Sequence, residues 1–237
     1  MSEIDRLRKE IDKIDLELLK AINKRSKIAI KIGQVKKSTN LFRPNRQADI
    51  LKKVFVANAN KLSPKLIFSF WRNLFFSQIN LQGGIHVITL KALKSSIITE
   101  IYDYFTHDIK IVFFKSLKTI ETKITSSENT ILILPYPSNK KNGDWWTKYS
   151  FDKTYIIASL PFLLDTGKKA SAVIISKYYP ELKIGNDYFY VAKNKIKDSR
   201  LKLEASANQH YLYKTNVIIK NLEIKFIGSS TKRYEIK

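Results

Sequence analysis

The sequence predicts a protein of two parts, an all-helical N-terminal segment followed by an α/β domain. Apolar residues recur with a helical period over the first third of the chain, and Gly83-Gly84 interrupts that pattern. Beyond the two glycines, short β-rich runs alternate with amphipathic stretches, which is typical of an α/β layer domain. We therefore expect a multi-domain chain, with a helical domain over residues 1–83 and an α/β domain over residues 84–237.

The first helix is predicted to begin at Ser2, a capping residue with Asp5 three positions further on. No proline or glycine follows until Gly33, and the apolar positions keep a helical period: Ile4, Leu7, Ile11, Ile14, Leu18, Ile22, Ala29 and Ile32. A helix of about 30 residues is about 45 Å long. One small domain cannot cover that length, so this helix is expected to pair with other helices.

Two more helices are predicted, at about 44–59 and 64–82. Pro44 suits the first turn of the second helix, and Ser63-Pro64 repeats the start signal for the third. The third helix carries apolar residues beyond a single stripe and is expected to be heavily buried: Leu66, Ile67, Phe70, Trp71, Leu74, Phe75, Ile79 and Leu81.

Six strands and three helices are predicted in the α/β domain. The β-rich runs are 85–90, 109–114, 130–134, 154–160, 170–175 and 188–192. The amphipathic helical candidates are 96–105, 116–123 and 195–206.

Composition excludes several classes of function. The 237 residues contain no cysteine and only three scattered histidines, so no metal site and no cofactor are expected. The formal charge of +22 comes from 43 basic and 21 acidic residues and divides evenly, +11 in residues 1–82 and +11 beyond. Nucleic-acid binders concentrate their charge, so compositional bias is the favoured interpretation and no nucleic-acid partner is expected. No signal peptide or long apolar run is visible, which predicts a cytoplasmic protein without a membrane partner.

Arginine is scarce in this lysine-rich chain, and six of its eight copies lie in the first 72 residues. Such positions favour a planar fork for carboxylate or phosphate. On a helical wheel, Arg25 and Lys36 fall inside the apolar stripe of the first helix. Between residues 18 and 82, Asp49 is the only acid facing fourteen basic residues. A buried cation needs an anion, so the missing anion is expected to be a ligand. The alternative is that the helix packs in a bundle and that Arg25 and Lys36 extend their charged ends from the edges of the helix contact into solvent.

Arg8 precedes Arg25 by 17 residues, about 25 Å along one helix. One helix therefore cannot bring both residues to one small molecule. Two antiparallel copies of the chain can, with Arg8 of one copy reaching the site around Arg25 of the other.

These residues resemble a known family, the all-helical (type II) chorismate mutases. The resemblance covers residues 1–82 and is carried by Leu7–Asp15, Leu18-Leu19, Arg25, Ile32–Lys36, Arg43–Arg46 and Gln78–Gln82. It implies a three-helix, intertwined homodimer that converts chorismate, a small dianion, to prephenate without a cofactor. The same resemblance implies a place in phenylalanine and tyrosine biosynthesis.

The resemblance also implies roles for individual residues. Arg25 and the partner subunit's Arg8 would clamp the two substrate carboxylates, with Arg46 supporting them. Lys36 and Gln82 would contact the ether oxygen as its bond breaks. Such a unimolecular rearrangement needs positioning and charge stabilisation but no base or nucleophile.

Three positions depart from the family pattern. Gln47 stands where an acid usually contacts the substrate hydroxyl, and its amide oxygen is expected to accept that bond instead. Arg43 occupies a further substrate-contacting position that is often acidic in the family, and it is expected to bind substrate here. Gln78 replaces a small residue and is expected to narrow or line the pocket. These departures leave two alternatives open, a pericyclic enzyme acting on isochorismate and a catalytically silent binding or regulatory protein; a nucleic-acid binder is the third.

The second domain weakly resembles a degenerate prephenate dehydratase domain. The Thr-Arg-Phe and acid-Asn-Ser motifs of that enzyme are missing, and Leu134–Asn139 is at best a counterpart of the latter. Trp145-Trp146 follows a turn at Asn142-Gly143 and is interpreted either as an aromatic binding lip or, more simply, as a cover for the sheet.

Overall fold

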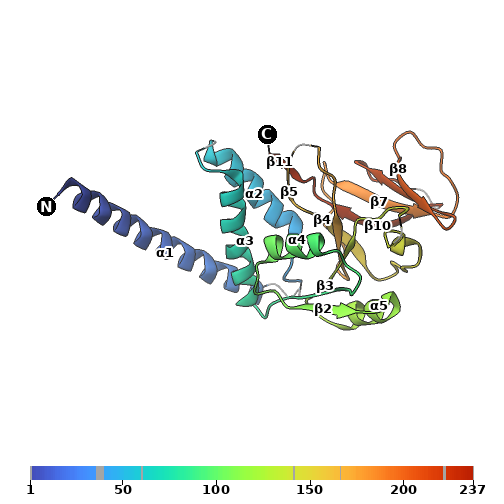
Figure 1. Ribbon diagram of the computed structural model, residues 1–237, viewed down its shortest axis with the longest axis horizontal. Helices are drawn as coiled ribbons and strands as arrows, with labels where there is room; N and C mark the ends of the chain where they lie inside the picture. Colours follow the sequence, from blue (N-terminus) through green and yellow to red (C-terminus); the bar gives the residue numbers. More distant parts are fainter. Residues whose placement is uncertain are drawn as a thin grey trace.

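The computed structural model describes residues 2–35, 40–59, 61–140, 142–165, 167–220 and 223–236. Three helices come first: α1 (Glu3–Val35), α2 (Pro44–Asn58) and α3 (Pro64–Asn80) (Figure 1). A mixed α/β unit follows from residue 86 onward. The predicted fold class is confirmed: a helical N-terminal region precedes a mixed-sheet α/β region. The assignment of residues 1–83 and 84–237 to separate domains stays a prediction.

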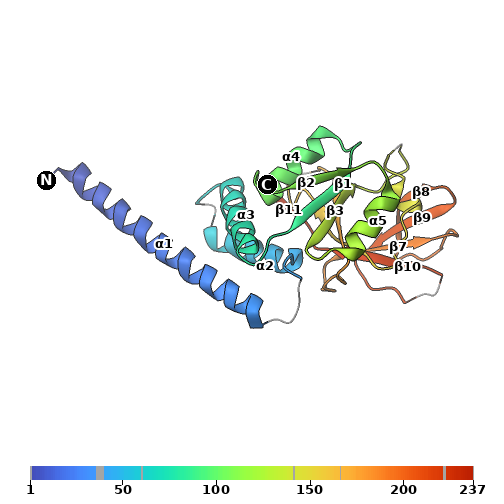
Figure 2. The same cartoon turned by 90° about the horizontal axis from the view of Figure 1, so that it is seen from below.

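Helix α1 begins at the predicted cap and then leaves the body of the molecule. Ser2 Oγ donates to Asp5 Oδ2 at 2.6 Å, and Ser2 N donates to the same oxygen at 3.1 Å. Figures 1 and 2 both show α1 projecting outward, with only its C-terminal end beside α3. No residue of α1 is buried, and its apolar stripe is exposed at Ile4, Leu7, Ile11, Ile14, Leu18, Ile28 and Ile32. The stripe predicted from the sequence therefore has no covering partner within one chain.

The starts of α2 and α3 follow the sequence signals. Pro44 occupies the first turn of α2, and Ser63 Oγ accepts from Leu66 N at 3.2 Å at the start of α3. Helix α3 buries Ile67, Phe75, Phe76 and Ile79. The expectation of heavy burial is wrong for its other side, where Leu66 and Leu81 are more than half exposed, because α2 and α4 cover only one side of the helix.

Nine strands form one mixed sheet in the order β2-β1-β3-β6-β4-β10-β7-β9-β8. Their bounds are β1 His86–Leu90, β2 Ile111–Phe114, β3 Thr130–Pro135, β4 Tyr155–Leu160, β6 Ala172–Ser176, β7 Asp187–Ala192, β8 Lys202–Ala207, β9 His210–Thr215 and β10 Lys225–Ser230. Strands β5 (Leu163–Asp165) and β11 (Tyr234–Ile236) pair separately, and a short 3₁₀ helix, η1, spans Trp145–Thr147.

Helices α4 (Ser95–Phe105) and α5 (Leu117–Ser126) cover opposite faces of the parallel strands β2, β1 and β3. Side chains alternate along a strand, and the two faces accordingly join different cores. Val87 packs in the cluster that contains α4, whereas Ile88 packs in the cluster that contains α5.

The α4 cluster also contains residues from α2 and α3. Leu51, Phe55 and Phe75 from the helical segment share it with Ile101 and Phe105 from α4. The helical segment is thus packed directly on the α/β region by way of α4.

The helix expected at 195–206 is wrong. Strand β8 begins at Lys202 and forms an antiparallel hairpin with β9 through a two-residue turn. Asn208 and Gln209 both have positive φ, 50° and 58°, as that kind of hairpin turn requires. Pairing with β9 overrides the amphipathic pattern, and the turn signal lies just beyond the window that suggested a helix.

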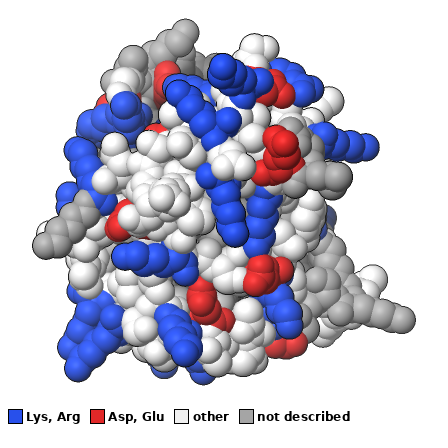
Figure 3. Space-filling view, turned by 90° about the vertical axis from the view of Figure 1, so that its right-hand side faces the viewer, with Lys and Arg blue, Asp and Glu red and all other residues white. Residues whose placement is uncertain are grey.

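Basic residues are dispersed on the face shown in Figure 3, with acidic and uncharged side chains between them. Within the described ranges, no helix is long and apolar enough to cross a membrane. The same residues contain no group of three or more His, Asp or Glu side chains with metal-site geometry.

Candidate functional site

Arg25 lies where the C-terminal half of α1 meets α3. Its guanidinium donates to Gln78 Oε1 and sits over the Phe75 ring, 5.3 Å from the centroid. Burial, and secondarily the positive charge of Arg46, lowers the pKa of Arg25. An arginine still keeps its proton in such a setting. Arg25 is therefore a half-buried, permanent cation with no ion pair in the described part of the chain.

Three polar residues, Ser26 of α1, Gln78 of α3 and Gln82 just beyond α3, form a connected group beside Arg25. Gln78 Nε2 donates to Ser26 Oγ at 3.3 Å, and Gln82 Nε2 donates to the Gln78 carbonyl at 2.9 Å. Gly33 makes room for this arrangement, because a Cβ there would lie 2.5 Å from Gln82 Oε1. The arrangement holds neutral amide groups next to a cation and leaves the positive charge of Arg25 unneutralised.

Arg46, in the first turns of α2, is exposed and close enough to Arg25 to act on its charge. Two guanidinium groups in proximity repel each other unless an anion lies between them or beside them. The electrostatics of this corner therefore favour an anionic ligand, as the sequence predicted.

Asp49, the single acid between residues 18 and 82, does not lie beside Arg25 but pairs with a lysine of the α/β region. Asp49 pairs with Lys183, and Lys183 also lies 3.6 Å from Glu181, both from the loop between β6 and β7. Arg43 Nε donates to Glu181 Oε1 at 2.8 Å. Arg43 was predicted to bind substrate, and the structure places it in this link between α2 and the α/β region.

Gln47 faces the interior and meets Arg72. Arg72 Nη1 donates to Gln47 Oε1 at 2.6 Å, and Arg72 Nε donates to the Tyr104 carbonyl at 2.6 Å. The guanidinium also lies over the Tyr104 ring at 3.5 Å. Since arginine can only donate, the amide oxygen of Gln47 must point toward Arg72. The oxygen expected to accept a substrate hydroxyl is thus already engaged.

Two predicted residues are not part of this group. Arg8 lies at the far end of α1, with its side chain 70% exposed and 4.0 Å from Asp5. It cannot reach Arg25 of the same chain, as the length of the helix predicted. Lys36 lies outside the described residues.

Sequence reasoning missed three contributors to the site. Phe75 was counted only as core, Ser26 was not singled out, and Gly33 was noted only as the first glycine of the helical pattern and as part of the Ile32–Lys36 motif. Arg72 did carry a signal, because it was one of the six early arginines in a chain that otherwise uses lysine. Its planar fork bonds an amide and a carbonyl while stacking on a ring, which lysine cannot reproduce.

At the usual ligand position of an α/β sheet, this protein has a small cavity of about 160 Å³, whose lining includes Leu90, Pro135 and Trp145. Ligands of such sheets bind at the carboxyl ends of strands where the strand order reverses, here beside the ends of β1 and β3. Trp145 and Trp146 are both buried at this edge, and their Nε1 atoms donate to the carbonyls of Pro135 and Ser138 at 2.8 and 3.1 Å. The tryptophans therefore cover the sheet, and the binding-lip interpretation is not supported.

Comparison with known proteins identifies the helical segment. Residues 7–83 match the chorismate mutase type II family. The predicted resemblance is confirmed over this segment, which contains every residue of the Arg25 group. The Arg25 group thus lies within the part of the chain that matches this family.

One curated relative reaches beyond the mutase segment. It is the bifunctional chorismate mutase/prephenate dehydratase of Aquifex aeolicus (strain VF5), 30% identical over 120 residues, which are 48% of this chain and 31% of the relative. The chain thus spans about a third of that protein's length. The matched stretch is longer than the mutase segment, in agreement with the dehydratase-like character suggested for the extension. No solved structure matches the chain significantly.

Proposed function

We propose that this protein is a chorismate mutase that rearranges chorismate to prephenate, a precursor of phenylalanine and tyrosine. One observation carries the proposal: Arg25 is a half-buried cation, next to Arg46 and bonded only to a neutral amide, in a segment that matches the mutase family. Chorismate carries two carboxylates, which supply the missing negative charge.

The residues of the site fit a reaction that needs no base. Arg25 would hold a carboxylate, with Arg46 supporting the positive potential. Gln82 Nε2 donates one N–H to the Gln78 carbonyl and keeps a second N–H. We assign this second N–H, together with Lys36, to the departing ether oxygen. Preorganised donors of this kind stabilise charge that develops as a bond breaks.

The proposed site is shared between two copies of the chain. The apolar stripe of α1 is exposed from Ile4 to Leu18 and again at Ile28 and Ile32, and Arg8 lies toward the opposite end of that helix from Arg25. Antiparallel pairing of two α1 helices would cover both stripes and bring Arg8 of each copy to Arg25 of the other. The active form we propose is a homodimer.

The first experiment follows chorismate loss by ultraviolet absorbance and identifies the product by chromatography. Prephenate formation by the wild-type protein, lost in Arg25→Ala, is the expected result. The same assay with isochorismate distinguishes the related pericyclic reaction. An inert mixture with folded, dimeric protein would contradict the enzymatic proposal.

A second candidate, a catalytically silent binding protein, is favoured by one specific observation. Both residues at the hydroxyl side of the site, Gln47 and Arg43, are engaged by groups of the protein itself, Arg72 and Glu181. Such a protein would still bind chorismate through Arg25. Calorimetric binding of chorismate without turnover would establish it.

A further inference from the structure

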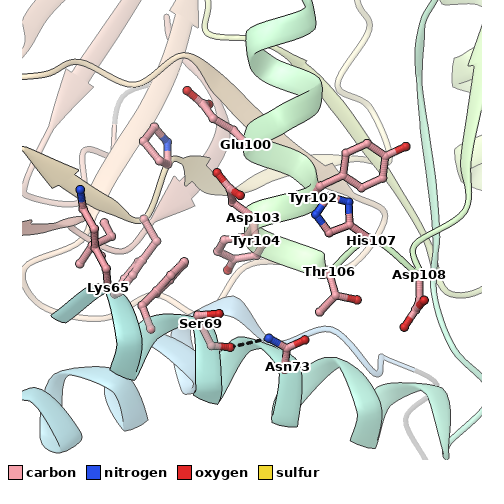
Figure 4. Close-up of a pocket in the computed structure, with 14 residues that line it drawn as sticks. Lys65, Ser69, Asn73, Glu100, Tyr102, Asp103, Tyr104, Thr106, His107 and Asp108 are labelled. Carbon is pink, nitrogen blue, oxygen red and sulfur yellow. Dashed lines mark hydrogen bonds between the residues drawn. The ribbon is translucent and has the colours of Figure 1, made fainter. Parts of the chain in front are cut away.

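A second cavity lies on the other side of α3, away from Arg25. It has a volume of about 540 Å³ and lies between α3, α4 and the turn that joins β4 to β5 (Figure 4). This volume falls within the range of small-molecule sites. The polar and apolar residues that line it include Lys65, Phe68, Asn73, Glu100, Asp103 and Phe162.

The charge of this cavity is opposite to that of the chain. Glu100, Asp103 and Asp108 all line it, with Lys65 as the lysine at its margin. In the ranges that the structure describes, none of the three carboxylates has an ion pair. Asp103 and Asp108 are exposed, whereas Glu100 is partly buried, so Glu100 is the carboxylate for which a cationic partner matters most.

Glu100 and Asp103 extend from the same side of α4, toward the end of α3 that carries Lys65 (Figure 4). Burial raises the pKa of Glu100; a hydrogen bond from Ser171 Oγ opposes that shift, and the Asp103 carboxylate adds to it. The negative charge of Glu100 is therefore costly in this partly buried position. A cation placed between the two carboxylates would offset that cost.

An aromatic wall adjoins the carboxylates. The rings of Phe68 and Phe162 stack with centroids 6.0 Å apart and planes 10° from parallel, and the Tyr104 ring lies 6.4 Å from that of Phe68. Phe162 is buried, whereas Phe68 keeps part of its surface exposed. A flat apolar group can therefore extend this stack from the cavity side.

We propose that this cavity binds a small molecule that combines a positively charged amine with a flat apolar body. The amine lies between Glu100 and Asp103, and the apolar body packs against Phe68. This site is separate from the Arg25 group and does not depend on the proposed mutase activity.

The test uses full-length protein, 2-phenylethylamine as the probe and 3-phenylpropionate as its matched control with the opposite charge. Calorimetric titration is expected to show at least about tenfold tighter binding of the amine. This is a demanding result, because the net charge of +22 by itself attracts the anion and repels the amine.

Variants then place the binding site. Asp103→Asn removes one exposed carboxylate from the cavity and is expected to weaken amine binding by about three- to tenfold. Glu128→Gln removes one exposed carboxylate from the loop before β3 and is expected to leave binding unchanged. Equal binding of the two probes, no binding of the amine at millimolar concentration, or equal losses in both variants would overturn the proposal.

Discussion

Helix α3 separates two sites of opposite charge, and in each site the described part of the protein leaves the charge without an ionic partner. Toward α1, Gln78 and Gln82 surround the cation Arg25 without supplying an acid. Toward α4, Ser69 and Asn73 face carboxylates to which no described lysine or arginine is paired. Acids are scarce in the helical segment, but lysine is abundant throughout the chain and still does not pair with the carboxylates of the second site in the described ranges. Unpaired charge on both sides of one helix is better explained by ligands than by folding.

The largest expected effect tests the cationic side. Arg25→Ala should lower turnover of chorismate by about 10²–10³-fold, because it removes a preorganised donor from the site. Its free energy of unfolding should change by no more than about 1 kcal/mol, since relief of desolvation offsets the lost bond to Gln78.

Arg200→Ala is the control for Arg25→Ala, because it removes the same charge from a loop where Arg200 pairs with Asp198. Turnover should stay within about twofold of wild type. Unfolding of Arg25→Ala, instead of loss of activity in a folded protein, would show that Arg25 is structural. The region around Arg25 would then not be a ligand site.

Mixing two variants tests whether Arg8 and Arg25 of one site come from different subunits. Arg8→Ala and Arg25→Ala proteins are each expected to be inactive, whereas unfolding and refolding them together should restore activity to about a quarter of wild type, because each heterodimer regains one intact site. The readout is prephenate formation per subunit. No recovery, with heterodimers shown by native mass spectrometry, would contradict a site shared between subunits.

Arg72 lies between the two sites, and its removal should affect stability most. Arg72→Ala leaves the Tyr104 carbonyl and Gln47 Oε1 buried without their donor, so we expect a loss of about 2–4 kcal/mol in urea unfolding. Arg72→Lys should recover less than half of that loss, because one ammonium lacks the planar fork. A loss below about 0.5 kcal/mol for Arg72→Ala would show that water replaces these bonds.

Gln47→Glu asks whether the position beside Arg72 serves folding or substrate. A carboxylate there would accept a charge-assisted bond from a buried guanidinium that has no acidic partner among the described residues. We expect a gain of about 0.5–2 kcal/mol at pH 7 with little change in turnover. A large loss of turnover at unchanged stability would instead place position 47 on the substrate.

The smallest expected effect tests the acidic side through pH. Because the pKa of Glu100 is raised in the folded protein, the folded state binds more protons than the unfolded state between the two pKa values, and stability falls as pH rises through that window. Glu100→Gln should therefore be slightly more stable than wild type at pH 7 and equal to it near pH 4. Urea unfolding at both pH values measures this, and equal stability at pH 7 would show that solvent already relieves the charge.

Much of this fold could be predicted locally. The cap at Ser2, the proline in the first turn of α2 and the cap at Ser63 each act within four residues, and the structure confirms the helices that they begin. The failure at 195–206 is also local in origin, because Asn208 and Gln209 turn the chain outside the stretch that was read as a helix.

The candidate site was predictable only where its partners lie within the helical segment. Arg25, Gln78 and Gln82 lie together as the resemblance implied, although their roles remain predictions. Arg43 and Gln47 could not be placed in the same way, because their environment includes Glu181 and Tyr104 from the α/β region. The bonds Gln47–Arg72, Arg72–Tyr104 and Arg43–Glu181 join residues 25, 32 and 138 positions apart, and contacts over such separations leave no periodic trace in a sequence.

The core that α2 and α3 share with α4 ties the folding of the helical segment to the α/β region. A fragment ending at Gly83 would uncover Leu51, Phe55 and Phe75 and would leave Arg72 without the Tyr104 carbonyl. The helical segment is therefore not expected to fold when it is excised or transplanted without the α/β region. The α/β region, whatever it binds, serves as its scaffold, and selection to keep the helices folded also preserves the extension.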